Sequence, residues 1–275
     1  MKIAFQGIRG AYSEMALHEH FGKSVETVSC DSFDDVFDAV INGSVVYGFI
    51  PVENTIAGTV VENYDLLFAN DVFVIAEAYL PIRHTLLAKK GARLEEITKA
   101  FSHPHALKQC KDFLKAHGIK VMPTYDTAGS AQMVADGDRM DHAAISSELC
   151  AEIYDMDILQ RDIQSNNSNT TRFFVIAKKE NVPADHVTGK TSVAFKTRHY
   201  PGALVDCLKI FQKYNLNLTK LESRPIPENP WEYVFYAAFE AGIDHDEVKA
   251  AIGELTLHAV FVKLLGSYPI AEKCW

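Results

Sequence analysis

Short apolar segments alternate with segments of helical periodicity through the first 160 residues, and this alternation is the feature that most limits the fold. An apolar run at residues 3–5 precedes a helical pattern from Ser13, and the apolar residues 47–52 precede another helix after Gly58. Strands that alternate with helices pack as α/β layers, in which the loops after the strands supply the functional site. We therefore predict an α/β domain with its site at such loops.

A β-rich stretch at residues 72–87 interrupts the alternation, and Pro81 is expected to break its strand. The alternation then resumes, and we expect the chain to return to the first set of strands near residue 160. This pattern predicts two small α/β lobes with a ligand cleft between them. The predicted bounds are residues 1–80 plus 160–180 for lobe one, 81–159 for lobe two and 1–180 for the whole domain.

A second domain is predicted after residue 190. Residues 181–190 are charged, contain Pro183 and Gly189, and lack an apolar period, which is typical of a linker. Residues 191–275 then show strands and helices in the order βαββαβ, which is the ferredoxin-like order. The predicted elements are strand 192–196, helix 202–214, strands 217–224 and 233–240, helix 244–255 and strand 260–265.

Composition excludes several classes of function. The chain has 27 Lys and Arg against 36 Asp and Glu, and a net charge of −9 argues against a nucleic-acid partner. No run approaches eighteen apolar residues, which argues against a membrane partner, and the chain starts directly with a strand, so we expect a cytoplasmic protein. The cysteines form no C-x-x-C pair, which suits buried thiols in a reducing compartment. They are Cys30, Cys110, Cys150, Cys207 and Cys274.

The first strand-to-helix loop contains Gly7 and Gly10. Its G-x-x-G spacing differs from the G-x-G-x-x-G of dinucleotide-binding loops, so a nucleotide site is not expected. Ser13 is predicted to cap the following helix, whose first N–H groups would face the cleft. This helix start either binds a ligand or is simply a capped helix.

Two further strand ends carry polar side chains. Glu53 and Asn54 end a buried strand, which favours a position in the cleft, and Gly58-Thr59 is predicted to open a helix. Ser102 ends another strand before a helix with proline in its first turn. His103 and His105, two residues apart, do not share a helix face, so no metal site is predicted.

The string NTTRFFVIA at residues 169–177 predicts a strand with a polar mouth. A hydroxyl at Thr171 could donate a hydrogen bond to a departing oxygen, and the chain shows no complete metal, thiol or phosphate-loop motif. Arg172 should point to the opposite face of a regular strand, where it would be an ion-pair partner. The implied chemistry is one that the substrate is already disposed to perform.

Six strings, FQGIRGAYSE, IPVENTIAGTV, SHPHALKQC, DTAGSAQMVA, NTTRFF and LESRP, together resemble the prephenate dehydratase family with its C-terminal ACT regulatory domain. The resemblance covers essentially the whole chain and includes the order of the motifs. The chain resembles the monofunctional form of the family, which has no chorismate mutase domain. The chain departs from the family pattern at His105, where members commonly have glutamine. The resemblance implies conversion of prephenate to phenylpyruvate, water and CO2 in L-phenylalanine biosynthesis, with no cofactor.

The resemblance also implies roles for individual residues. Thr171 is the implied catalytic donor to the leaving hydroxyl. The implied substrate-binding residues are Asn54, Ser102, Ser13, Gly58 and Thr59, with Glu53, Tyr12, Arg172 and Phe173 ranked lower. L-phenylalanine is the implied allosteric effector, bound between subunits of a homodimer or homotetramer. The implied effector-binding residues are Gly202, Ala203, Leu204, Val205, Asn217, Glu222, Ser223, Arg224 and Pro225.

Three alternatives stay open at this point. Arogenate dehydratase, or dual activity, shares the fold and motifs and differs at the side-chain end of the substrate, where a carboxylate could pair with an ammonium. The two-lobed architecture also resembles type II periplasmic binding proteins, although the chain shows no signal peptide or helix-turn-helix. A third possibility is an amino-acid sensor without catalytic activity.

Overall fold

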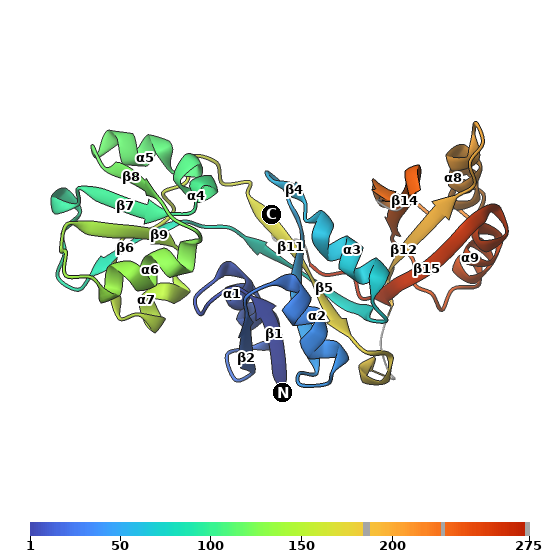
Figure 1. Ribbon diagram of the computed structural model, residues 1–275, viewed down its shortest axis with the longest axis horizontal. Helices are drawn as coiled ribbons and strands as arrows, with labels where there is room; N and C mark the ends of the chain where they lie inside the picture. The colour runs from blue at the N-terminus through green and yellow to red at the C-terminus, as the bar shows by residue number, and fades with distance from the viewer. Residues whose placement is uncertain (184–187, 227–228, 273–275) are drawn as a thin grey trace.

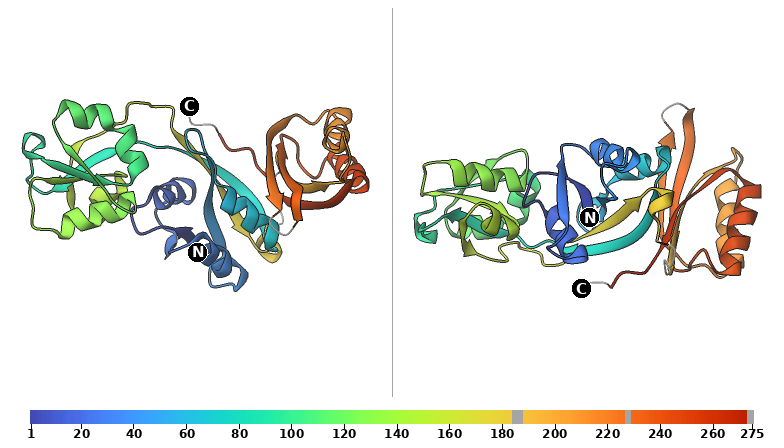
Figure 2. Two further views of the ribbon diagram at one scale, coloured as in Figure 1. Left: turned by 45° about the horizontal axis from the view of Figure 1, so that its top comes forward. Right: turned by 90° about the horizontal axis from the view of Figure 1, so that it is seen from below.

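The computed structural model describes residues 1–183, 188–226 and 229–272. Three units lie in a row along the long axis of the molecule (Figure 1; Figure 2). A lobe coloured green lies at one end, the N-terminal lobe is in the middle, and the C-terminal unit coloured orange and red is at the other end. Residues 184–187 of the predicted linker and Cys274 lie outside the described residues.

The larger of two sheets runs through the middle lobe and the C-terminal unit, in the order β13-β14-β12-β15-β5-β11-β3-β1-β2, with β4 paired to β3. β1 is parallel to β2 and β3, whereas β11 is antiparallel to both β3 and β5. Its strands are β1 Lys2–Gln6, β2 Glu26–Cys30, β3 Tyr47–Asn54, β4 Gly58–Thr59, β5 Phe73–Pro81, β11 Thr170–Ala177, β12 Lys190–Thr197, β13 Leu218–Ile226, β14 Asn229–Phe239 and β15 Ala259–Tyr268.

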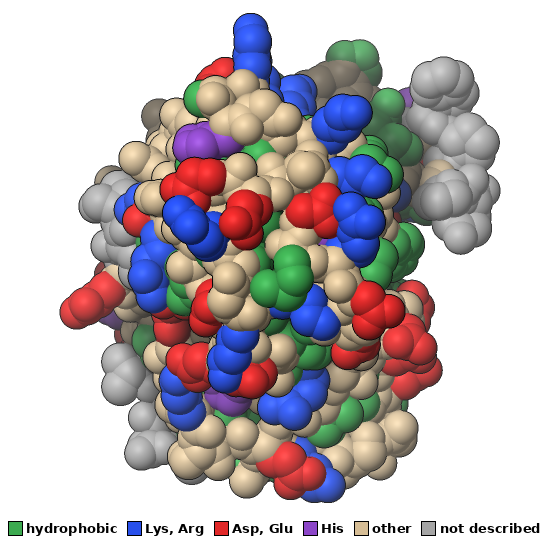
Figure 3. All heavy atoms as spheres, turned by 90° about the vertical axis from the view of Figure 1, so that its left-hand side faces the viewer, with side chains coloured by type: hydrophobic (Ala, Val, Ile, Leu, Met, Phe, Trp, Pro, Cys, Tyr) green, Lys and Arg blue, Asp and Glu red, His purple; other side chains and the backbone are tan. Residues whose placement is uncertain are grey.

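The smaller sheet belongs to the end lobe and has the order β10-β6-β9-β7-β8. Its strands are β6 Thr85–Lys89, β7 Lys99–Ser102, β8 Lys120–Pro123, β9 His142–Ser146 and β10 Met156–Gln160. The α-helices of the described chain are α1 Tyr12–Phe21, α2 Phe33–Ile41, α3 Val61–Ala69, α4 Pro104–Gln109, α5 Lys111–Ala116, α6 Thr127–Asp136, α7 Leu149–Ile153, α8 Ala203–Lys213 and α9 Asp246–His258. Figure 3 views this end lobe, where basic and acidic side chains are interspersed.

The predicted α/β alternation is confirmed, and so is the break at Pro81, because β5 ends there and β6 begins at Thr85. The chain enters the end lobe through this break and returns between β10 and β11. The two lobes have separate apolar cores, which contain Phe49 and Phe173 in the middle lobe and Leu86 and Ile145 in the end lobe. The two lobes also touch each other, because Ile8 and Ala11 of the middle lobe pack against a further end-lobe cluster around Leu87.

The predicted ferredoxin-like order of the C-terminal unit is also confirmed. The four strands β12 to β15 pair antiparallel in the order β13-β14-β12-β15, and helices α8 and α9 cover the outer face (Figure 1). β15 joins this unit to the middle lobe by pairing parallel with β5 at Gly266 and Val74. A Cβ at Gly266 would lie 2.1 Å from the Val74 carbonyl oxygen, so glycine is required for this approach.

Two local predictions are wrong. Ser13 does not cap α1, because the N-cap is Ala11, which has no capping side chain, and Ser13 lies in the first turn. Gly58-Thr59 does not open a helix but forms β4, which returns antiparallel on β3, and α3 starts only at Val61. The hairpin forms because Asn54 accepts hydrogen bonds from the backbone of Ile56 and Ala57 and so closes the turn.

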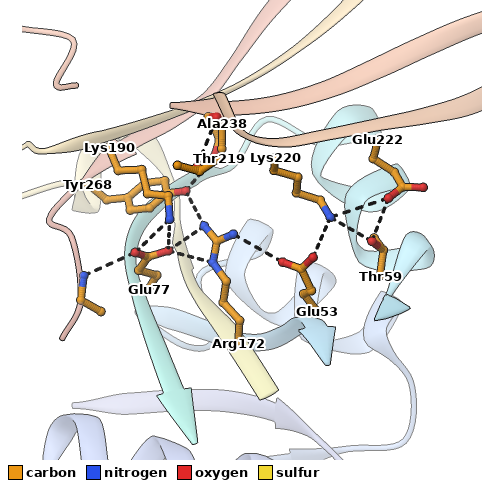
Figure 4. Close-up of polar contacts among 12 residues, drawn as sticks. Glu53, Thr59, Glu77, Arg172, Lys190, Thr219, Lys220, Glu222, Ala238 and Tyr268 are labelled. Carbon is orange, nitrogen blue, oxygen red and sulfur yellow. Dashed lines mark hydrogen bonds and ion pairs between the residues drawn. The ribbon is translucent and has the colours of Figure 1, made fainter. Parts of the chain in front are cut away.

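A buried ion cluster lies where the C-terminal unit meets the middle lobe (Figure 4). Glu77 of β5, with its side chain 1% exposed, accepts from Arg172 Nε at 2.8 Å and lies 3.2 Å from Lys190 Nζ. Burial alone would lower the pKa of Arg172, but Tyr268 and Glu77 together raise it, so the guanidinium stays charged. Burial and Arg172 lower the pKa of Lys190, against the opposing effect of Glu77.

We expect Glu77→Gln to reduce the free energy of unfolding by about 3–5 kcal/mol, because it leaves two buried cations without their carboxylate. Urea unfolding followed by circular dichroism measures the loss. Glu152→Gln is the control, since Glu152 pairs with Lys23 on the surface, where such pairs contribute about 0–1 kcal/mol. Equal effects of the two substitutions would show that the cluster does not stabilise the junction.

Candidate active site

A pocket of about 320 Å³ lies between the middle lobe and the end lobe. The middle lobe contributes Asn54 from the end of β3, and Thr171 and Phe173 from β11. His103 precedes α4, and Gln109 ends it, on the side of the end lobe. The cleft predicted between the lobes is therefore present, and it has side chains from both lobes.

Thr171 faces this pocket because of the period of β11. Thr171 and Phe173 lie on the pocket face of the strand, while Arg172 between them points into the ion cluster. The predicted opposite orientation of Arg172 is confirmed by its contact with Glu77. One strand thus serves the pocket with one face and the domain junction with the other.

Asn54 orients the Thr171 hydroxyl. These two residues are partners across β3 and β11, and Asn54 Nδ2 donates to Thr171 Oγ1 at 2.9 Å. A hydroxyl that accepts from an amide keeps its own hydrogen for another acceptor. Within the described residues the Thr171 hydrogen has no protein acceptor, so it is available to a group in the pocket.

The amide of Asn54 is fully used by the protein. Its Nδ2 donates its second hydrogen to Asn169 Oδ1 at 2.7 Å, and its Oδ1 accepts from the backbone N–H groups of Ile56 and Ala57. Two donors at Oδ1 fix which end of the amide is oxygen. With two hydrogens and both lone pairs engaged, Asn54 positions Thr171 and has no remaining capacity to bind substrate directly.

A chain of neutral hydrogen bonds continues from Asn54 across the cleft. Asn169 Nδ2 donates to Gln109 Oε1 at 3.1 Å, and His84 Nε2 lies 2.6 Å from the same oxygen. His84 Nδ1 in turn lies 2.7 Å from the hydroxyl of Tyr12, at the start of α1. The network therefore connects α1, the β5–β6 connection, α4 and the ends of β3 and β11.

Burial keeps the ionisable members of this network neutral. His84 is 3% exposed, and burial lowers its pKa, although the hydrogen bond to Gln109 opposes the shift. Because Gln109 Oε1 only accepts, the proton of neutral His84 belongs on Nε2, and Nδ1 accepts from the Tyr12 hydroxyl, which shares its hydrogen with the Arg83 carbonyl oxygen 3.0 Å away. Burial raises the pKa of Tyr12 well above its usual value, so the phenol remains a donor.

The described residues that line the pocket include no cationic Lys or Arg side chain, so an anion there would depend on other donors. Among the lining residues, Tyr12 and Ser13 begin α1 and Thr127 begins α6. The first N–H groups of a helix are unpaired and carry a partial positive charge, so helix starts attract anions. Two helix starts, one from each lobe, thus face the same pocket, and at α6 the Asp126 carboxylate already accepts from the Gly129 N–H.

Several residues predicted for the substrate site lie elsewhere. Ser102 is buried and donates to the Ile145 carbonyl oxygen at 2.6 Å, so it joins β7 to β9. Glu53, Thr59 and Arg172 face the C-terminal unit, because they alternate with Asn54, Gly58 and Thr171 along their strands, and Gly58 itself does not line the pocket. The predicted residues that the structure does bring together are Tyr12, Ser13, Asn54, Thr171 and Phe173.

Four residues that line the pocket were not predicted as site residues: His84, Gln109, Asn169 and Asp126. Asn169 is the first residue of the string that predicts a strand with a polar mouth, so this string contained a signal for it. Gln109 lies four residues after His105 and therefore on the same face of α4. His84 carries no local signal, because its role arises from partners 25 and 72 residues away in the chain.

A second pocket, of about 530 Å³, lies in the C-terminal unit and is lined by Gly202, Ala203, Leu204 and Val205 at the start of α8. Gly202 is the N-cap with φ of 94°, a conformation that favours glycine. The other predicted effector residues do not line this pocket. Asn217 precedes β13, and Glu222, Ser223, Arg224 and Pro225 lie on that edge strand.

The described residues lack two kinds of feature and contain four free cysteines. Among the described residues, no group of three or more His, Cys, Asp or Glu side chains is arranged to hold a metal ion. The same residues include no helix with the length and apolar character needed to cross a bilayer. Cys30, Cys110, Cys150 and Cys207 are free thiols.

We expect His84 to make the fold sensitive to acid. Histidine in an unfolded chain titrates near pH 6.5, and the pKa of His84 is lower in the folded state, so below about pH 6.5 the unfolded chain binds a proton that the folded chain does not. The free energy of unfolding therefore falls as the pH drops through this window and levels off below the folded pKa. Urea unfolding at about pH 7.5 and 5.5 should show a smaller loss for His84→Gln than for the wild type.

His245→Gln is the matched control for this measurement, because His245 is an exposed histidine at the start of α9. It should keep the acid sensitivity of the wild type. If His84→Gln also keeps it, His84 is not the group that titrates on unfolding.

Comparisons with known proteins agree on one family. The family described as prephenate dehydratase matches residues 3–181. Arogenate dehydratase/prephenate dehydratase 2, chloroplastic, of Arabidopsis thaliana is 37% identical, over 98% of this chain and 73% of the relative. A solved structure of prephenate dehydratase from Arthrobacter aurescens in complex with L-Phe is 27% identical with a TM-score of 0.88, covering 98% of this chain and 90% of that chain.

A further solved structure, described as GqqA, a novel type of quorum quenching acylases, is 29% identical with a TM-score of 0.91 and covers 98% of both chains. Likeness in fold therefore extends to a protein described by a different activity. The sequence match decides the family. Because that match spans more than half of the chain, and the Arabidopsis relative is more than 30% identical over nearly all of it, the chain belongs to the prephenate dehydratase family.

Proposed function

We propose that the chain converts prephenate to phenylpyruvate, water and CO2. The observation that carries this proposal is the Thr171 hydroxyl, which accepts from Asn54 and keeps its hydrogen for a group in the pocket. In the reaction, the electron pair of the ring–carboxylate bond enters the ring as the bond to the ring hydroxyl breaks. The aromatic ring that forms drives the step, so the protein supplies positioning and a donor to the departing oxygen.

The helix starts offer backbone donors to the carboxylates of this substrate. The N-termini of α1 and α6 come from different lobes, but at α6 the Asp126 carboxylate already accepts from the Gly129 N–H, so the start of α1 is the freer site for a substrate carboxylate. Donation from backbone N–H groups also suits a decarboxylation, because a carboxylate locked in a strong salt bridge would resist leaving as neutral CO2. A pocket without Lys or Arg among its described lining residues is consistent with this requirement.

The site is better suited to hydrogen-bond donation than to nucleophilic attack. A nucleophilic hydroxyl needs a neighbouring base to take its proton. The partner of Thr171 is the amide of Asn54, which donates to the hydroxyl and cannot accept its proton. This geometry supports a lyase reaction and does not support acyl transfer through Thr171, the activity class in the description of one structural relative.

Arogenate is the alternative substrate, and one observation favours it. Asp126, the N-cap of α6, places a carboxylate at the pocket, where an ammonium of arogenate could pair with it. The Arabidopsis relative carries both activities in its description. Dual activity on prephenate and arogenate is therefore a second candidate. Measurable turnover of either substrate would exclude the third alternative, an amino-acid sensor without catalytic activity.

Turnover of prephenate and arogenate, measured side by side near pH 7.5, tests the proposal. We expect Thr171→Val to lower kcat on the preferred substrate by about a hundred- to thousandfold, as loss of one transition-state donor typically does. Thr170→Val is the control, because Thr170 is the adjacent threonine and faces the junction. A folded Thr171→Val chain with wild-type turnover would remove Thr171 from the mechanism.

We propose that residues 191–275 form an ACT regulatory domain, that residues 1–180 form the catalytic domain, and that L-phenylalanine inhibits the enzyme. The Arthrobacter relative was solved with L-Phe bound. The start of α8 offers N–H groups for the effector carboxylate, and Leu204 offers an apolar wall. Glu222 to Pro225 lie on β13 and do not line this pocket. In a homodimer or homotetramer, a second subunit would supply these four residues to the effector site.

A cytoplasmic location is part of the same proposal. Cys110, Cys150 and Cys207 are buried free thiols, and Cys30 is partly buried and also free. Thiols persist in this form in a reducing compartment. The chloroplastic relative shows that the same family also works in an organelle.

We expect Val205→Glu to weaken inhibition by L-phenylalanine without changing uninhibited turnover. Val205 lines the α8 pocket and is 53% exposed, so a charge there is tolerated by the fold but opposes the carboxylate and the apolar ring of the effector. The effector concentration for half inhibition should rise about tenfold or more, as for a loss of about 1.4 kcal/mol. Val260→Glu on β15 is the control, since Val260 is exposed and lies outside that pocket.

A further inference from the structure

We propose that Lys220 of the C-terminal unit is a positioning residue for the reaction, acting through Glu53 on the strand that holds Asn54. This inference rests on the proposed function and extends it to the domain junction. Lys220 belongs to β13, whereas Glu53 is the last residue before Asn54 on β3. The active-site strand end would thus be completed by a residue from a different folding unit.

Lys220 holds both strands of the β3–β4 hairpin (Figure 4). Its Nζ lies 3.3 Å from Glu53 Oε1 and 2.9 Å from Thr59 Oγ1, and these two residues are partners across the hairpin. Its side chain is 6% exposed, and its Nζ lies 5.2 Å from the centre of the Tyr64 ring. A buried ammonium with several partners is fixed far better than one in solvent.

The hairpin is connected to the catalytic pair through Arg172. Glu53 and Arg172 are partners across β3 and β11, and Glu53 Oε2 lies 3.7 Å from Arg172 Nη1. The next pair along the same two strands is Asn54 and Thr171, which meet on the pocket face. Glu53 therefore lies between two cations on the junction face, one residue from the contact that orients the catalytic hydroxyl.

Loss of the Lys220 charge would free the hairpin. Glu53 has a side chain 40% exposed, so without Lys220 it can turn toward water and leave Arg172 to Glu77 alone. Its neighbour Asn54 closes the β3–β4 turn and donates to Thr171, so rotation of this strand end misplaces the hydroxyl. A small misplacement of a catalytic group costs up to about a hundredfold in rate.

The same lysine lies on the strand with the proposed effector segment. Glu222, two residues after Lys220, accepts from Thr59 at 3.0 Å and begins the segment that ends at Pro225. An effector that moves this part of β13 would therefore change the Lys220 and Glu222 contacts with the hairpin. Substrate turnover and effector binding would be coupled through the same side chains.

The test is Lys220→Met, which keeps most of the side-chain length and removes the charge. We expect kcat on the preferred substrate to fall about ten- to hundredfold with KM changed by less than about threefold, and inhibition by L-phenylalanine to weaken. Lys220→Arg should restore most of the turnover, because the charge is restored. A loss through general unfolding would instead lower the amount of active enzyme and the thermal midpoint.

Lys263→Met is the matched control. Lys263 belongs to β15 of the same unit and also reaches the middle lobe, where its Nζ donates to the carbonyl oxygens of Leu67, Phe68 and Asn70 at the end of α3. It contacts neither β3 nor β11 through these bonds. Its loss weakens docking of the unit, so a fall in kcat equal to that of Lys220→Met would overturn a specific role for Lys220.

A double-substitution cycle with Glu53→Gln locates the effect. If Lys220 acts through Glu53, the double variant should lose no more turnover than the more damaging single variant. Additive losses, or wild-type turnover of a folded Lys220→Met chain, would overturn the inference while leaving the proposed function intact. A wild-type chain that turns over neither prephenate nor arogenate would instead refute the proposed function, and the positioning role with it.

Discussion

Strand β11 is the constraint on which the rest of the structure depends. It pairs with both β3 and β5, and its alternating side chains meet two different environments. Thr171 and Phe173 face the pocket, while Arg172 completes a cluster of buried charges with Glu77. A shift of one residue in register would exchange these faces, placing a guanidinium in the pocket and a hydroxyl among the buried charges. The ion cluster therefore protects the register that the active site requires.

The hydrogen-bonded network that reaches Thr171 uses neutral groups, and this has a physical reason. The members that contact one another are amides, a phenol and a buried imidazole whose pKa is lowered by burial. Inside a low-dielectric pocket, fixed neutral dipoles stabilise a departing oxygen without needing to reorganise, and they do not trap the carboxylate that must leave. Formal charge is kept on the other face of β11, where carboxylates balance it.

The sequence was sufficient for features that depend on local period and order. The α/β alternation, the βαββαβ unit and the opposite facing of Thr171 and Arg172 all follow from spacing along the chain. Features that depend on distant partners were not predictable. Glu53 and Thr59 resembled cleft residues because their partner Lys220 lies more than 160 residues further along the chain. Glycine and threonine at 58 and 59 resembled a helix start because the β3–β4 pairing was not visible.

The network across the cleft links the two lobes to the alignment of Thr171, the proposed catalytic donor. Tyr12 belongs to the middle lobe and His84 to the connection into the end lobe, so their contact joins the middle lobe to this connection. From His84, hydrogen bonds lead to Gln109, then to Asn169 and then to the Asn54 amide. This amide orients Thr171. Orientation of the Thr171 hydroxyl thus depends on a row of contacts that includes residues of both lobes, and not on β3 and β11 alone.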